Sequence, residues 1–136
     1  MKLKSQYTKR KKGMTLLELT VVILVLLALI AILFVGARAW KRGADRSANI
    51  LNIRNIQQAV RGHANMFNLD FGDTLASTEI VSSDGSTGYM KEPEAPGTLS
   101  AYTYTGDVPV IGSLYSPNNA DDAVYGFTSS AEYQDW

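Results

Sequence analysis

An apolar run near the N-terminus constrains the fold of this chain more than any other feature. Residues 19–37 are 19 consecutive uncharged residues, nearly all of them Leu, Ile, Val, Ala or Phe. About 20 apolar residues span the hydrocarbon core of a membrane as a helix. Glu18 stands directly before the run, and a carboxylate inside a bilayer costs up to a few kcal/mol, on the order of 3 at the centre. We therefore expect Glu18 to have a partner.

Charge is distributed unevenly along the chain, although its formal net charge is zero. Residues 1–12 contain six Lys or Arg and no acid, and four basic residues follow the apolar run: Arg38, Lys41, Arg42 and Arg46. The positive-inside rule therefore favours a cytoplasmic N-terminus, by six basic residues to four. Residues 92–136 contain seven acids and no Lys or Arg, which argues against a nucleic-acid partner. The chain has no Cys, so disulfides, Cys-ligated zinc and thiol chemistry are excluded.

Two interpretations of the N-terminal region compete. A secretory signal peptide has a basic start, an apolar stretch of about 7–15 residues and a cleavage site of the A-x-A kind. Ala37-Arg38-Ala39 is a poor version of that site, because an Arg stands inside it. The apolar run is also too long, and Glu18 stands at its start. A lasting membrane helix is the better interpretation.

The residues around Glu18 also form a recognisable motif. The sequence KKGMTLLEL at residues 11–19, followed by the apolar run, resembles the N-terminus of type IV pilins and of the pseudopilins of type II secretion. The resemblance implies that residues 1–13 are a leader, that prepilin peptidase cuts between Gly13 and Met14, and that the new amine of Met14 is methylated. Glu18 then becomes the fifth mature residue, as in the family. The first mature residue is Met here, where the family most often has Phe.

The electrostatics of such a cleavage agree with the resemblance. Cleavage would create an α-ammonium group at Met14 next to hydrocarbon, and a buried charge is tolerated only when it is paired. Glu18 of one subunit can neutralise Met14 of its neighbour and so set the axial register of stacked helices. Repeated head to tail, this contact does not close and builds a filament. The alternatives are an interfacial Glu18 that reaches water and a Gly13 that only breaks the helix.

Apolar periodicity continues beyond the apolar run. A stripe at intervals of three or four residues indicates an amphipathic helix; its members are Ile50, Ile53, Ile56, Val60, Ala64 and Phe67. We predict one nearly continuous helix from about Thr15 to about Phe67, roughly 80 Å long. Residues 14–37 would be its transmembrane or filament-core part and residues 38–67 an amphipathic stalk. Gly36 stands where many family members have a Pro that can loosen the helix on assembly.

Residues 68–136 form the predicted head of an α+β, pilin-like fold. We expect a short helix near Leu75–Val81 and a small antiparallel sheet of about three strands packed on the long helix. The strands are predicted from alternating β-forming residues at 102–104, 108–114 and 124–128. Five tyrosines of the head either belong to its core and edges or form an adhesive surface: Tyr102, Tyr104, Tyr115, Tyr125 and Tyr133.

Catalytic and metal-binding patterns are scarce. His63 is the one His, and we interpret it as a residue flanking the apolar stripe. No phosphate-binding loop or nucleophile motif occurs, so we expect neither an enzyme nor a cofactor. Oxygen ligands for Ca²⁺ are offered by a cluster that is equally an ordinary turn: Asn118, Asn119, Asp121 and Asp122.

Taken together, these features predict a structural subunit rather than a catalyst. Its expected partners are prepilin peptidase, an inner-membrane assembly platform, and copies of itself or other pilins or pseudopilins. We expect a single-pass protein of the bacterial inner membrane with a periplasmic head, assembled into a type II secretion pseudopilus or a type IV pilus. The alternative is a single-pass binding or adhesion module that does not polymerise. Four basic residues beyond the span (Arg38, Lys41, Arg42 and Arg46) would contact lipid head groups or acidic heads of neighbouring subunits.

Overall fold

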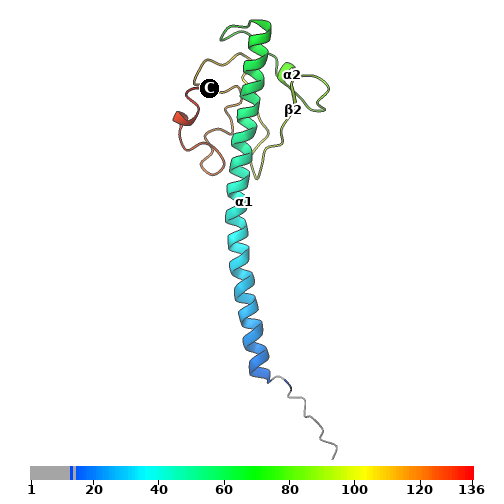
Figure 1. The fold of residues 1–136 in the computed structure, drawn as a ribbon, viewed down its shortest axis with the longest axis vertical. Coiled ribbons are helices and arrows are strands. Elements are labelled where there is room, and N and C mark those ends of the chain that lie inside the picture. The colour runs from blue at the N-terminus through cyan, green and yellow to red at the C-terminus, as the bar shows by residue number, and fades with distance from the viewer. Residues whose placement is uncertain (1–12, 14) are drawn as a thin grey trace, which may run out of the picture. The chain divides into compact units, whose positions relative to one another are not determined.

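A computed structural model describes residue 13 and residues 15–136. The elements run in the order α1 (Leu16–Phe67), α2 (Ser77–Ile80), β1 (Val81–Ser82), β2 (Met90–Lys91) and a 3-10 helix (Ser130–Glu132), as Figure 1 shows. The chain divides after Arg38 into two compact units, which we describe one at a time. The helix predicted from about Thr15 to about Phe67 is confirmed, since α1 is continuous over its 52 residues.

The first unit contains the apolar part of α1. Every residue of 15–38 is exposed, although most side chains here are large and apolar. This part of α1 is long and apolar enough to cross a membrane, and none of its most apolar stretch is buried within the chain. Its side chains therefore have no partner among the described residues and require one outside them, either lipid or protein.

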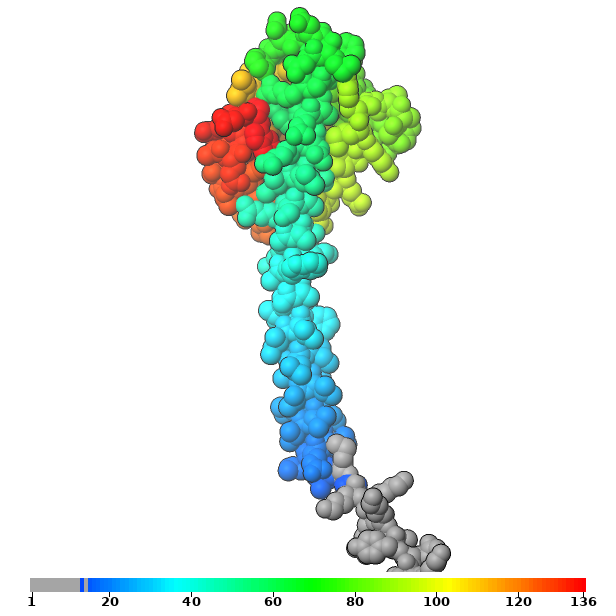
Figure 2. Space-filling view, in the orientation of Figure 1, coloured from blue at the N-terminus to red at the C-terminus, as the bar shows by residue number. Residues whose placement is uncertain are grey.

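The second unit, Ala39–Trp136, has the C-terminal half of α1 as its central element, and Figures 1 and 2 show chain on both sides of that half. The buried face of α1 consists of Asn49, Ile53, Ile56, Gln57, Val60, His63 and Ala64. The predicted apolar stripe is thus confirmed in its middle, whereas Phe67 at its end is 61% exposed. Residues beyond α1 complete the core: Leu75, Ile80, Val81, Tyr102, Val108, Leu114, Tyr115, Ala120, Phe127 and Tyr133.

The predicted antiparallel sheet is wrong. The structure has one two-stranded parallel sheet, in which Val81 pairs with Met90 and Ser82 with Lys91. The segments expected as strands at 102–104, 108–114 and 124–128 are irregular, and one isolated antiparallel bridge joins Thr74 to Asp107. The short helix predicted near Leu75–Val81 is present as α2.

Side chains replace the missing sheet ladder as partners for the loop main chain. Asn49 Nδ2 donates hydrogen bonds to the carbonyls of Asn119 and Tyr125, both at 2.9 Å. Gln57 accepts one from the Tyr115 amide at 3.0 Å and donates one to the Ser113 carbonyl at 3.1 Å. Buried main-chain groups need hydrogen-bond partners. Here the side-chain amides of Asn49 and Gln57 supply them without any strand pairing.

Candidate processing and assembly site

The N-terminus of α1 is closed by a reciprocal pair of hydrogen bonds. The Thr15 amide donates to Glu18 Oε2 at 3.0 Å, and the Glu18 amide donates to Thr15 Oγ1 at 3.2 Å. The Leu19 amide donates to the Thr15 carbonyl at 3.1 Å. This is a capping box, in which a Thr at the N-cap and a Glu three residues later satisfy two main-chain amides that the helix leaves unpaired.

The capping box fixes the position of the Glu18 carboxylate. It lies at the positive end of the helix dipole, where negative charge is favourable, and within hydrogen-bonding distance of the Thr15 amide. Thr15 follows Met14 directly in the sequence. Glu18 therefore presents its charge beside the first turn of α1, close in sequence to the predicted new N-terminus.

Of the two residues at the predicted cleavage site, the structure describes Gly13 and not Met14. Gly13 is exposed, and a Cβ built on it would meet no atom within 4 Å. Met14 lies outside the described residues, as do residues 1–12 of the leader, so cleavage and methylation there stay predictions. The sequence interpretation missed Thr15 as a site residue. Its signal was the T-x-x-E spacing directly before an apolar run, which is typical of a capping box.

The four basic residues beyond the span separate into two groups. Arg46 is half-buried, and its Nε donates to the Gly126 carbonyl at 2.9 Å. Arg38, Lys41 and Arg42 are exposed. Arg46 thus stabilises the second unit by a hydrogen bond, whereas the other three are free to contact lipid head groups or neighbouring subunits, as predicted from the sequence.

The four candidate calcium ligands hold the loop that contains them. Asn118 accepts a hydrogen bond from the Thr103 amide and Asn119 donates one to the Ser100 carbonyl. Asp122 Oδ1 accepts from the amides of Val124 and Tyr125, both at 2.8 Å, and Asp121 Oδ1 accepts from the Tyr133 hydroxyl at 3.3 Å. No group of three or more His, Cys, Asp or Glu side chains that could hold a metal ion is found in the described part of the chain. Calcium binding is not tested by these contacts.

The single histidine and three tyrosines of the head belong to the packed interior. His63 is buried rather than flanking; its ring stacks on Phe67 at 4.4 Å and meets the edge of Tyr89 at 5.4 Å. Tyr102, Tyr115 and Tyr133 are buried, and burial raises the pKa of each phenol. Three of the five tyrosines considered for an adhesive surface are therefore core residues.

Comparison with protein families gives one match, which falls on the N-terminal region. The model of the prokaryotic N-terminal methylation motif matches residues 8–34, a range that includes Gly13, the capping box and most of the apolar part of α1. Comparisons with curated proteins and with solved structures give no match. The chain therefore carries the prepilin-type motif of type IV pilins and pseudopilins, which supports a pilin-type protein processed by prepilin peptidase.

Proposed function

We propose that this protein is a structural subunit of a type II secretion pseudopilus or a type IV pilus. Prepilin peptidase removes residues 1–13, the amine of Met14 is methylated, and the mature chain assembles with copies of itself or with other pilins or pseudopilins. Assembly takes place on an inner-membrane platform. The chain has no catalytic role and no cofactor in this proposal.

One observation carries the proposal: the methylation motif is in register with a capped apolar helix that lacks partners among the residues that the structure describes. The match at residues 8–34 covers Glu18, which is held at the first turn by Thr15. The apolar side chains of residues 16–37 are exposed. Such a helix needs lipid before assembly and neighbouring helices after it, which are the two surroundings of a pilin-type subunit.

The proposed membrane orientation places the leader in the cytoplasm and residues 38–136 in the periplasm. It rests on the six basic residues of the leader against four beyond the span, because basic residues are retained on the cytoplasmic side. In this orientation Arg38, Lys41 and Arg42 meet the outer head groups of the inner membrane, with the exposed ring of Trp40 beside them. Aromatic and basic side chains are favoured at that depth.

The mass of the mature N-terminal peptide, isolated from membranes, tests the proposal. We expect a chain that begins at methylated Met14. A chain that begins at Met1 would support the membrane-anchored binding module, and one that begins near Trp40 would indicate a secreted protein. Replacing Gly13 with Val should leave the leader on, whereas Gly43→Val, at a second open glycine position, should be cut normally.

The role of Glu18 is tested separately from cleavage. Glu18→Ala should still be cut and yet fail to enter filaments, because the Met14 amine of the neighbour then lacks its counter-charge. Asp45→Ala is the matched control, since it removes a carboxylate from the same helix beyond the apolar run. Normal filament incorporation of Glu18→Ala would remove the pairing between subunits from the proposal.

A further inference from the structure

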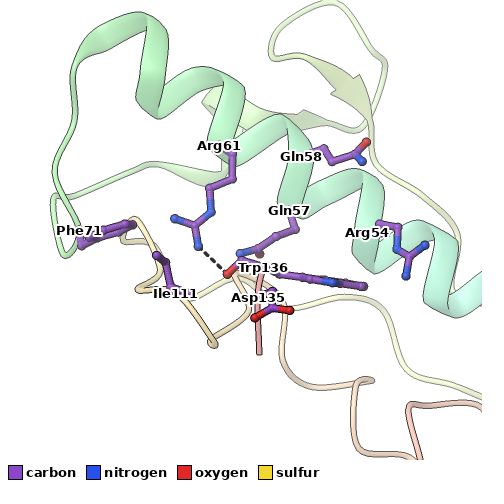
Figure 3. A pocket seen from close by; sticks show the side chains of 8 residues that line it. All are labelled: Arg54, Gln57, Gln58, Arg61, Phe71, Ile111, Asp135 and Trp136. Carbon is purple, nitrogen blue, oxygen red and sulfur yellow. Dashed lines mark hydrogen bonds between the residues drawn. The ribbon is translucent and has the colours of Figure 1, made fainter. Parts of the chain in front are cut away.

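A pocket that contains two arginines opens between α1 and the loops of the second unit. Its volume is about 660 Å³, and Figure 3 shows the eight side chains that line it. Four come from α1 and four from the loops: Arg54, Gln57, Gln58, Arg61, Phe71, Ile111, Asp135 and Trp136. The charged side chains of this lining are two arginines and one aspartate.

Both guanidinium groups of the pocket are held in place by contacts with aromatic residues, Trp136 and Phe71. Arg54 Cζ lies 4.7 Å from the centre of the Trp136 ring, and Arg61 Cζ lies 5.2 Å from that of Phe71. Arg61 also donates a hydrogen bond to the main-chain oxygen of Trp136 at 2.9 Å, drawn as a dashed line in Figure 3. Burial lowers the pKa of Arg61. Because a guanidinium has five donors in a fixed fork, these two retain the capacity to bind a carboxylate.

The loop that joins β1 to β2 carries an acid suited to that pocket. Asp84 is exposed, and its neighbours in the loop are Ser, Thr and Gly. Asp84 Oδ1 accepts hydrogen bonds from the amide and the hydroxyl of Ser86, at 3.0 and 2.7 Å, and these bonds lower the pKa of the carboxyl. A carboxylate has about four acceptor sites, so Asp84 can also accept from a guanidinium.

Four other acids of the head are engaged elsewhere or line the pocket themselves. Asp121 and Asp122 hold their own loop, as described above. Glu132 accepts a hydrogen bond from the Thr128 amide. Asp135 lines the pocket itself. The small side chains around Asp84 make its loop narrow, which favours entry into a pocket of this size.

The pocket and the loop lie on different sides of α1. In Figure 2 the yellow-green segment around β1 and β2 projects on one side, and the red C-terminal segment, which includes Trp136, lies on the other. A contact between two such sites on different copies joins unlike surfaces. Contacts of this heterologous kind leave one free loop and one free pocket at the ends, so they extend into an open array unless a ring closes.

We infer that the Asp84 loop of one copy docks into the Arg54/Arg61 pocket of a second copy, in a head-to-tail contact between neighbouring subunits. The inference rests on the proposed function, because it identifies a second contact within the same assembly. Opposite charge selects this pairing and its register, while the aromatic rings exclude water around it.

The contact also constrains the displacement of neighbours along the helix axis. The base of the loop lies beside His63 and Met66, through Tyr89, and the pocket spans Arg54 to Arg61. The copies are thus offset by about 2 to 12 helix residues, or about 3–18 Å at 1.5 Å per residue. Pairing of Glu18 with a neighbour's Met14 requires an offset of four helix residues between the copies, about 6 Å along the axis. Both contacts can therefore occur in one array.

Disulfide cross-linking tests the contact, because the chain has no cysteine of its own. Ser83→Cys beside Asp84 and Gln58→Cys in the pocket are both at exposed positions. In the full chain assembled in cells and oxidised with copper-phenanthroline, we expect a ladder of dimers, trimers and longer species. Each single-cysteine variant should give no ladder, and neither should Gln58→Cys combined with Ala123→Cys, an exposed position elsewhere on the head.

Charge variants provide the second measurement. Asp84→Asn keeps the hydrogen-bond acceptor of the loop but removes its charge, and Arg54→Gln removes one charge from the pocket. Each should lower the assembled fraction by about fivefold, the change expected when one partly exposed ion pair is lost. Asp107→Asn, at another exposed acid of the head, should leave it unchanged.

The outcomes separate the two proposals. Filaments of cut chain with no ladder, or charge variants that assemble normally, would overturn the loop-in-pocket contact and leave the proposed function standing. Cross-linked dimers alone would overturn the head-to-tail geometry. Wild-type chain that is not cut at Gly13, or that is cut and never assembles, would overturn the proposed function itself.

Discussion

The two parts of α1 belong to one helix and differ in where their partners lie. Residues 16–38 are all exposed, and their apolar side chains surround the helix. In residues 39–67 one face is buried beneath loops of the same chain, with Ile53, Ile56 and Val60 at most 1% exposed. The same backbone hydrogen bonding therefore serves two surroundings, and the side-chain pattern decides which one each part requires.

The difference shows what each part contributes to stability. The second part is the surface on which the head folds, since the loops have little regular structure of their own and pair their main chain with Asn49 and Gln57. The first part adds nothing to that core. Mutations in the two parts should consequently report on different processes: folding of the head in one, and membrane insertion or assembly in the other.

The largest difference between the two parts is expected at high pH, which should unfold the head and leave the apolar part of α1 helical. Burial raises the pKa of four phenols in the head: Tyr102, Tyr104, Tyr115 and Tyr133. Below pH about 10 the phenols are protonated in the folded and in the unfolded head, and the head keeps its full stability. Above it the unfolded chain releases these protons first, so stability falls as pH rises. Residues 19–37 contain no ionisable side chain and should stay helical.

Circular dichroism and phenolate absorbance, followed together in detergent, measure this difference. We expect loss of head structure and ionisation of the phenols to coincide above pH 10. Tyr104→Phe should move the midpoint to higher pH, because it removes one of the protons that drive the transition. Ionisation of all the phenols near pH 10 in a head that remains folded would contradict the prediction.

The next largest difference concerns equivalent substitutions in the two parts. Ile56 is completely buried and Ile30 is 48% exposed. Ile56→Ala should lower the free energy of unfolding of the head by about 2–5 kcal/mol, because it removes apolar contacts and leaves a cavity. Ile30→Ala should leave that free energy unchanged. Thermal unfolding in detergent, followed by tryptophan fluorescence, makes the comparison, and equal effects would mean that the apolar part also contributes to the core.

Two glycines of the second unit should respond oppositely to alanine. A Cβ on Gly126 would clash with the Ala120 carbonyl oxygen, whereas one on Gly62 would meet nothing within 4 Å. Gly126→Ala should destabilise the head by about 1–3 kcal/mol through overpacking. Gly62→Ala, in the exposed interior of a helix, should stabilise by up to about 1 kcal/mol. Chemical denaturation of the two variants measures both, and a stable Gly126→Ala would show that this loop can shift.

The smallest effect distinguishes the basic residues near the boundary between the two units. Arg46→Ala removes the hydrogen bond to the Gly126 carbonyl and should cost the head about 1 kcal/mol. Arg42→Ala removes an exposed charge and should change its stability by less than about 0.5 kcal/mol. The same denaturation assay ranks them. Equal values would place the start of the packed head elsewhere along α1.

Sequence patterns predicted the helical elements well and the sheet poorly. The apolar run at residues 19–37 and the apolar stripe from Ile50 to Phe67 predicted α1, because the contacts that define a helix are local. Residues 102–104 alternate as a strand would, yet Tyr102 is buried against α1 and donates to Asn49 Oδ1 at 2.7 Å. Alternation indicates which side chains are inward, and it does not reveal whether the main chain pairs with another strand or with side chains.

The parallel pair of β1 and β2 was missed for a related reason. Parallel strands ordinarily need a crossover of a dozen residues or more, and here a short loop joins them. Gly88 makes this close return workable, since it has φ +81° and a Cβ there would lie 2.9 Å from the main chain of Ile80. The Tyr89 amide donates to the Ile80 carbonyl at 2.9 Å. Pairing of two residues leaves no periodic signal in a sequence.

The sequence by itself determined the membrane-compatible helix, its amphipathic continuation, and the motif at Gly13, Met14 and Glu18. These are local properties, written in consecutive residues. Tertiary structure decided the rest: the burial of His63, the use of Asn49 and Gln57 as partners for the loops, and the pocket that Arg54 and Arg61 form with Trp136. Those features join residues tens of positions apart, and their energies depend on distances that a linear pattern does not contain.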